Sequence, residues 1–152
     1  MSWSALRDLL TEEVEIASHS NTHPQLDRLA AAQAQDEAVQ SKRLIQDALA
    51  LDPSGFAYPY GYWDRNSRRM VAASGYGYAC GVGEIPAVPS DDPFALPRLS
   101  VNAGITISEF DQILRLKRTR TLERASFAKR VAWRALRDLR LVHRMPRSFP
   151  PS

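Results

Sequence analysis

Short apolar segments alternate with helical segments along the first half of this 152-residue chain. Strands are predicted at 14–18, 55–58 and 76–82, because each is a short apolar or aromatic run that ends at a polar or glycine-containing loop. Long helical patterns at 29–51 and 64–73 separate these runs. This alternation predicts an α/β fold in which parallel strands and flanking helices form a sheet or part of a (β/α) barrel.

The remaining segments of this part are shorter. Ser2 or Ser4 is a suitable N-cap for a helix to about residue 12, whose apolar side chains, Trp3 among them, face inward. A loop with four prolines is predicted at 84–97, and a final short strand at 99–101. The prolines make regular structure unfavourable in that loop.

The end of the chain is helical and basic. Helices are predicted at 108–117 and 121–142, and the second carries an apolar stripe with most of its arginines off the stripe. Residues 111–152 hold 12 Lys and Arg against 3 Asp and Glu, whereas residues 1–110 hold 8 against 14. A basic helix can bind anionic polymers, but an apolar stripe favours docking on the chain's own domain. Nucleic acid is therefore not expected as a partner.

Composition excludes several classes of protein. The chain has a single cysteine, Cys80, so no internal disulfide or cysteine metal cluster is expected. No run of about 18 apolar residues is present, and no transmembrane helix is expected. The first residues do not have the basic-then-apolar order of a signal peptide. Localisation stays open.

Two histidines, His19 and His23, follow the first predicted strand at a spacing of four residues. Neutral imidazole is the commonest protein ligand for transition metals, and open zinc sites often combine two histidines with a carboxylate. Pro24 disfavours helical geometry at His23 and favours an extended one, which places both side chains at the carboxyl end of the strand. The alternatives are a hydrogen-bonded structural pair, or former ligands that have lost their carboxylate partner.

Four segments occur in an order that is typical of one family. They are Glu15 to Pro24, Ser41 to Leu44 with Phe56 to Gly61, Ala73 to Ala79, and Phe94 to Leu99. Together these segments resemble the motifs of the polysaccharide deacetylases, carbohydrate esterase family four. The resemblance implies a partial (β/α) barrel of the deacetylase type, with His19 and His23 as metal ligands.

The resemblance also implies a segment that the sequence does not contain. Family domains open with a strand ending in T-F-D-D-G, which supplies the catalytic base and the third metal ligand. Asp91-Asp92, the only Asp-Asp pair, lies far downstream in the proline-rich loop. The chain is therefore expected to correspond to the C-terminal part of the family domain at 1–107, with a basic helical extension at 108–152 packed on it.

Other site residues are implied by the same motifs. Tyr60 matches the position whose backbone N–H stabilises the oxyanion of the tetrahedral intermediate, and Pro59 favours the turn that this requires. Tyr58, Pro59 and Arg98 are expected to contact substrate, although Tyr58 in an aromatic strand can equally pack in the core, and Arg98 can equally form a structural salt bridge. Many members carry Arg where this chain has Ala57, an Arg that orients the base.

The family's late L-x-H motif, which carries the general acid, has no counterpart near Leu96-Pro97-Arg98. Leu141-Val142-His143 fits the letters, but we interpret this match as a coincidence, because it lies in the arginine-rich segment beyond the expected domain.

The function implied by the resemblance is metal-dependent hydrolysis of N-acetyl groups on an amino-sugar polysaccharide or oligosaccharide. The implied cofactor is a divalent metal, with zinc preferred and cobalt or nickel as alternatives. Without a base, the isolated chain is expected to be weak or inactive. A second chain, either a missing N-terminal half or another copy, is a candidate partner. The alternative is a non-catalytic remnant or binding module of the same fold.

Overall fold

The computed structural model describes residues 1–10, 14–116 and 119–139. These residues form two compact units. The first comprises Met1–Gly81 with Asp92–Leu96, and the second Val82–Asp91 with Pro97–Ser152. The domain boundary predicted near residue 107 remains a prediction.

Three strands form one sheet in the order β1 (Gly55–Ala57), β2 (Tyr78–Val82) and β3 (Leu96–Arg98). β1 and β2 are parallel, with Gly55 opposite Tyr78 and Ala57 opposite Cys80. On the other side of β1, Ser18 forms an isolated parallel bridge with Phe56. The predicted α/β fold with parallel strands and flanking helices is confirmed.

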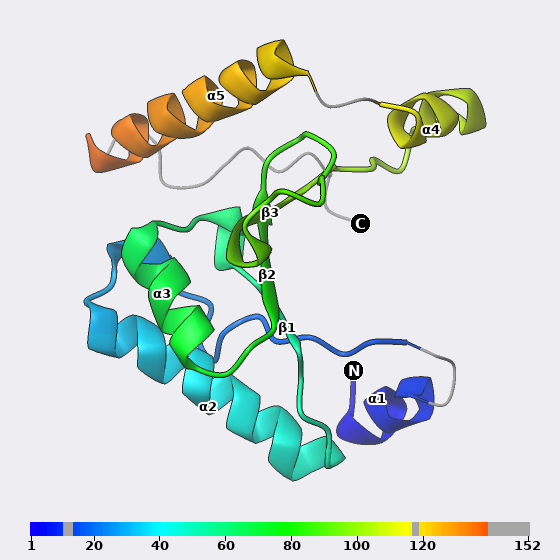
Figure 1. Ribbon diagram of the computed structural model, residues 1–152. Coiled ribbons are helices and arrows are strands. Elements are labelled where there is room, and N and C mark those ends of the chain that lie inside the picture. Colours follow the sequence, from blue (N-terminus) through cyan, green and yellow to red (C-terminus); the bar gives the residue numbers. More distant parts are fainter. Residues whose placement is uncertain (11–13, 117–118, 140–152) are drawn as a thin grey trace. The chain divides into compact units, whose positions relative to one another are not determined.

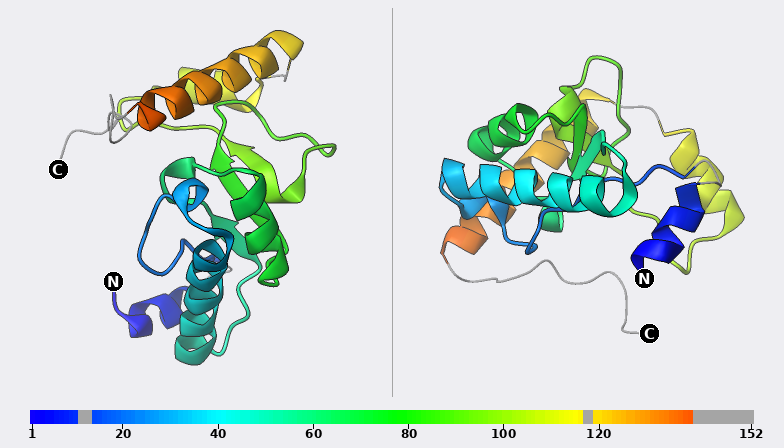
Figure 2. Two further views of the ribbon diagram at one scale, coloured as in Figure 1. Left: turned by 90° about the vertical axis from the view of Figure 1, so that its left-hand side faces the viewer. Right: turned by 90° about the horizontal axis from the view of Figure 1, so that it is seen from below.

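The helices of the first unit follow the predicted pattern (Figure 1, Figure 2). They are α1 (Trp3–Leu9), α2 (Ala31–Leu49) and α3 (Arg65–Ala73). α3 packs against α2, which also contacts α1. Asp64 caps α3 by accepting from the Ser67 N–H at 2.9 Å, and Gly75 follows its end with φ of 82°, as the sequence predicts. Single 3₁₀ turns lie at Leu26–Arg28, Pro59–Gly61 and Pro93–Ala95.

Two predicted strands are wrong in their extent. Of 14–18, only Ser18 pairs with another strand, and Val14 is 42% exposed. The strand predicted at 99–101 lies instead at β3 and contains Pro97. Proline donates no ladder hydrogen bond, but an edge strand tolerates it, and β3 is at the edge of the sheet. Trp3, predicted to face inward, is 46% exposed.

The second unit contains α4 (Ile107–Leu114) and α5 (Arg120–Asp138), capped by Thr106 and Thr119. Both helices were predicted, although residues 140–142 of the second prediction lie outside the described residues, as does His143. Within the unit, Ser126 of α5 donates to the Gly83 carbonyl at 2.5 Å. Packing of these helices on the first unit remains a prediction. In the described part of the chain, no helix has the length and apolar character to span a membrane.

The core of the first unit is a cluster of aromatic and aliphatic side chains from β1, β2 and the segments packed against them. Phe56 packs edge-to-face on Tyr58 and on Tyr76, with ring centroids 5.5 and 5.1 Å apart. Aromatic pairs in this geometry stabilise beyond the area they bury. The other members of the cluster are Leu26, Ala38, Val71 and Ala79.

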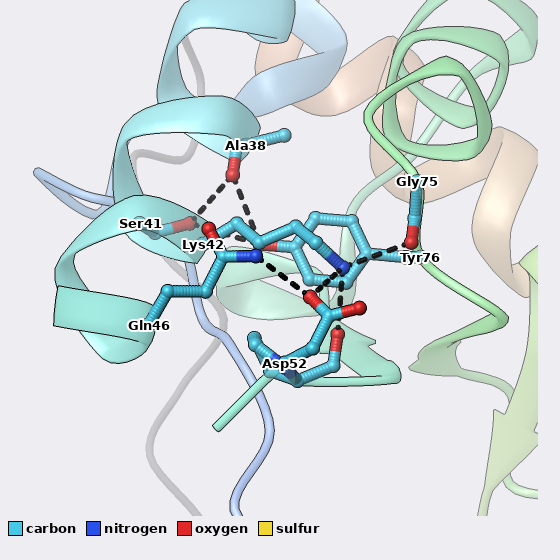
Figure 3. A network of polar contacts seen from close by, with 8 residues as sticks. Ala38, Ser41, Lys42, Gln46, Asp52, Gly75 and Tyr76 are labelled. Atoms are coloured by element: carbon cyan, nitrogen blue, oxygen red, sulfur yellow. Dashed lines mark hydrogen bonds and ion pairs between the residues drawn. The ribbon is translucent and has the colours of Figure 1, made fainter. Parts of the chain in front are cut away.

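Lys42, in one of the motif segments, joins α2 to the segment before β1 and to the loop between α3 and β2 (Figure 3). Its ammonium donates to the carbonyls of Pro53 and Gly75 at 3.1 and 2.9 Å and pairs with Asp52 at 2.7 Å. It also lies 4.8 Å from the centroid of the Tyr76 ring. The hydrogen bond from Lys42 holds the pKa of Asp52 below its usual value. These contacts hold α2 against Asp52 and Pro53, which precede β1, and against Gly75, which follows α3.

Candidate functional site

Backbone pairing with β1 determines where His19 lies. The Ser18 N–H donates to the Gly55 carbonyl at 2.9 Å, and the Ala57 N–H donates to the Ser18 carbonyl at 2.8 Å. The chain therefore runs parallel to β1 as it reaches His19, which emerges beside the carboxyl end of that strand. This edge is where α/β folds place their ligands.

The two imidazoles converge on one point. His19 Nδ1 lies 2.7 Å from the carbonyl oxygen of Ala57. A carbonyl only accepts, so Nδ1 carries the proton and the lone pair of a neutral His19 is on Nε2. His23 Nε2 lies 3.1 Å from that atom, and both side chains are exposed. A carbonyl bond of this kind fixes the tautomer and ring direction of metal-ligating histidines.

The spacing of these nitrogens fits a shared divalent ion, and it equally fits the alternative, a hydrogen bond between the two rings. With metal–nitrogen bonds of about 2.0–2.1 Å, two ligands are roughly 2.9 Å apart at a right angle and roughly 3.4 Å apart in a tetrahedron. The distance between His19 Nε2 and His23 Nε2, 3.1 Å, lies between these values. In residues 1–10, 14–116 and 119–139, no group of three or more His, Cys, Asp or Glu side chains is arranged to hold a metal. The described residues thus bring two imidazole nitrogens together, those of His19 and His23.

The loop between the histidines has an uncommon backbone conformation. Ser20 and His23 have φ of 66° and 61°, in the left-handed region. The expectation that Pro24 would make His23 extended is wrong, because Ser20 Oγ accepts from the His23 N–H at 3.0 Å and favours a tight turn. Non-glycine residues in this region cost roughly 1–3 kcal/mol and persist where surrounding contacts hold them.

Tyr60 lies next to the pair. Its ring meets the ring of His23 edge-to-face with centroids 4.6 Å apart, and stacks on Tyr62 at 5.8 Å. The Pro59–Gly61 turn closes β1, and Tyr60 has φ of 58°. In the first turn of a helix, N–H groups lack partners within the turn and are available to other acceptors. The turn that carries the proposed oxyanion donor is thus beside the histidines.

The other predicted contact residues have different surroundings. Tyr58 is fully buried, its hydroxyl donates to the Phe94 carbonyl at 2.9 Å, and burial raises the pKa of this phenol. Pro59 is also buried. The structure therefore places both in the core rather than on an open groove. Arg98 ends β3 in the second unit, where its carbonyl accepts from the Glu84 N–H at 3.0 Å. Substrate contacts by these residues remain predictions.

Asp64 and Asp92 both have partners within the fold. Asp64 accepts from the N–H and hydroxyl of Ser67 at the start of α3. Asp92 pairs with Arg68 and also accepts from the Phe94 N–H at 2.8 Å. Both carboxylates thus stabilise the fold.

Sequence reasoning missed Glu37. This α2 residue accepts three hydrogen bonds from Asn21 and Thr22, inside the histidine loop. A lone glutamate within a helix gives no local signal of this role, because its partners are 15 and 16 residues away in sequence.

A family model described as polysaccharide deacetylase matches residues 1–79, just over half of the chain. The chain belongs to the polysaccharide deacetylase family. The Bacillus subtilis protein YxkH, named for this family, is 30% identical over 107 residues, which is 69% of this chain and 38% of YxkH. A chitooligosaccharide deacetylase from Bradyrhizobium is 35% identical over 72 residues, 46% of this chain and 32% of that protein. This polysaccharide deacetylase family member thus spans about a third of the length of these relatives.

Solved structures of deacetylases share the fold. The Streptococcus pyogenes deacetylase PplD, in complex with acetate, has a TM-score of 0.71 at 17% identity, over 74% of this chain and 50% of PplD. A polysaccharide deacetylase from Bacillus cereus has a TM-score of 0.66, also at 17% identity, over 75% of this chain and 36% of that one. About three quarters of this chain therefore shares the fold of these deacetylases.

Proposed function

We propose that this chain carries the histidine half of a metal-dependent N-deacetylase site, which acts on N-acetyl groups of amino-sugar polymers. The observation that supports this most is the convergence of the two Nε2 atoms of His19 and His23, beside the Tyr60 turn, in a member of the deacetylase family.

Each residue has a distinct task in this proposal. His19 and His23 hold the divalent ion, zinc in preference to cobalt or nickel, and the Ala57 carbonyl orients His19. When bound, such an ion polarises an acetyl carbonyl and favours ionisation of a water molecule. The Tyr60 N–H donates to the oxygen that becomes negative as the carbonyl is attacked.

The proposal assigns no general base to residues 1–152, which contain no T-F-D-D-G segment. A carboxylate from elsewhere, in the same protein or in a second chain, is needed to complete the site. On its own this chain is expected to be weak or inactive. The second candidate, a non-catalytic module of the same fold, is favoured by the lack of a third ligating side chain among the described residues.

Zinc binding to the purified 152-residue chain tests the histidine pair. The dissociation constant is measured by competition with a chromophoric chelator, for the wild type and for His19→Ala and His23→Ala. Because each variant removes one of two protein ligands, each is expected to weaken binding at least tenfold.

The matched control is His143→Ala, the same substitution at the remaining histidine of the sequence. It is expected to leave the affinity within about twofold of the wild type, since it is not assigned to the site. Equal affinity in all four proteins would sink the metal-site proposal, and would favour the non-catalytic module.

A further inference from the structure

The loop that carries the histidines is fastened to α2 by one side chain. Glu37 Oε2 accepts from the backbone N–H groups of Asn21 and Thr22 at 2.9 and 2.8 Å, and Oε1 accepts from the Thr22 hydroxyl at 2.6 Å. Hydrogen bonds to an ionised acceptor are roughly twice as strong as neutral ones. Three of them converge on the two residues between Ser20 and His23.

This loop requires an external constraint. Ser20 and His23 both have left-handed backbone angles, which are unfavourable for residues with a Cβ atom. The bond from the His23 N–H to Ser20 Oγ lies within the loop and does not fix its position on the domain. The bonds to Glu37 fix the position of the loop on the domain, because α2 is itself packed against α3 and held by the contacts of Lys42.

α2 also holds the chain on the other side of His19. Ser41 follows Glu37 by one helical turn, so both side chains lie on the same face of α2. Ser41 Oγ is 2.6 Å from Ser18 Oγ, and both residues are buried. His19 is therefore bracketed by two contacts to one helix, Ser18 with Ser41 before it, and Asn21 and Thr22 with Glu37 after it.

We propose that Glu37 is a positioning residue for the metal site, which holds the 19–23 loop so that the two Nε2 atoms converge. This inference rests on the metal-site function proposed above. Both oxygens of Glu37 accept bonds from the loop, so the residue acts through the loop and is not itself the third ligand.

The first test uses the zinc-free chain. Hydrogen exchange of the Asn21 and Thr22 amides is measured by NMR in the wild type, Glu37→Ala and Glu37→Gln. Removal of the acceptor in Glu37→Ala is expected to speed exchange of both amides about tenfold or more. Gln keeps one carbonyl oxygen for the two N–H groups, and its NH₂ can donate to the Thr22 hydroxyl, so Glu37→Gln is expected to retain most of the protection.

The second test measures zinc affinity of the same proteins. Glu37→Ala is expected to bind zinc about 10- to 100-fold more weakly, as is typical when an outer partner of a metal site is removed. Glu37→Gln is expected to stay within a few-fold of the wild type. Glu84→Ala is the matched control, because Glu84 likewise accepts from a backbone N–H and a hydroxyl of one residue, Ser100, but in the second unit.

The outcomes separate the two proposals. Wild-type exchange and wild-type zinc affinity in Glu37→Ala, with affinity still lost in His19→Ala, would overturn the role of Glu37 and leave the histidine site intact. Zinc binding that is insensitive to His19→Ala would overturn the metal site itself. In that case the exchange rates still decide whether Glu37 holds the loop. A loss in Glu37→Gln as large as in Glu37→Ala would overturn the hydrogen-bonding account.

Discussion

His19 is oriented by a backbone carbonyl, that of Ala57, and its loop by the backbone N–H groups of Asn21 and Thr22. Such partners depend on the course of the chain rather than on side-chain identity. This explains how Ala57, where many family members have Arg, is compatible with an ordered pair of imidazoles. The direction of His19 therefore does not depend on the side chain at position 57.

At the same scale, the hydroxyl of Tyr78 joins the start of β2 to Glu15, in the segment before His19. Burial, and then the hydrogen bond from its hydroxyl to Glu15 Oε1 at 2.8 Å, raises the pKa of Tyr78 to about 12. In the unfolded chain a tyrosine ionises near pH 10. Above pH 10 the unfolded state therefore binds fewer protons than the folded state, so the stability contributed by Tyr78 falls as pH rises from about 10 to 12.

The prediction is that Glu15→Gln moves the titration of Tyr78 to lower pH. Glu15 supplies part of the shift and burial the larger part, so the midpoint is expected to fall below 12 and remain above 10. Absorbance at 295 nm measures tyrosinate, and subtraction of the Tyr78→Phe curve isolates Tyr78 from the other four tyrosines. An unchanged midpoint in Glu15→Gln would contradict the assigned cause.

At the scale of elements, local signals predicted the helices well. Asp64 and Gly75 are the cap residues that the sequence indicates for α3, because capping depends on neighbours three or four residues away. Strands depend on pairing instead. The apolar run at 14–18 has the composition of a strand, but only Ser18 has a bridging partner. Composition alone does not reveal how far a strand is paired.

The site could also be predicted only in part, because some of its contacts join residues that are distant in sequence. The H-x-x-x-H spacing and the Pro59–Gly61 turn indicate which residues meet, since parallel strands end at one edge. The left-handed angle of His23 and the role of Glu37 depend on a contact between the loop and α2. No pattern within the loop specifies that contact.

The end of α2 offers a prediction of its own. Ala50 caps this helix with φ of 53°, a left-handed conformation that favours glycine, and it is exposed. Ala50→Gly is expected to stabilise the protein by about 0.5–1 kcal/mol, because relief of the left-handed strain exceeds the entropy lost by glycine. Urea unfolding at unchanged slope measures the difference.

The control for this prediction is Ala48→Gly, two residues earlier and inside α2. The same substitution there is expected to destabilise by up to about 1 kcal/mol, because Ala48 lies in the last turn of α2 and glycine is less favourable than alanine in a helix. A loss of stability in both variants would show that the conformation at Ala50 does not carry the expected strain.

At the scale of the whole molecule, the described site residues belong to one unit. His19, His23, Glu37, Ala57 and Tyr60 all lie within Met1–Gly81, whereas α4 and the arginine-rich α5 belong to the other unit. The family model covers nearly the same span, residues 1–79. Metal binding should therefore depend on the first unit, while the Arg-rich end of the chain has no assigned part in the site.

The last prediction concerns activity of the 152-residue chain. Acetate release from N-acetylglucosamine oligomers is expected to be very low, even with added zinc or cobalt. Loss of a general base alone typically lowers the rate about 10²–10⁴-fold, and two imidazoles hold an ion less tightly than two imidazoles and a carboxylate. The assay compares the wild type with His19→Ala, and the expected result is equally low release from both.

Robust release that His19→Ala abolishes would contradict this account of an incomplete site. A carboxylate within the chain would then have to act as the base. Asp64 and Asp92 are the candidates, but Asp64 caps α3 and Asp92 pairs with Arg68. Use of either carboxylate as a base would break a contact that stabilises the fold. Asp64→Asn and Asp92→Asn are therefore expected to lower the free energy of unfolding and to leave acetate release unchanged. Loss of the observed turnover in one of these variants would identify the base.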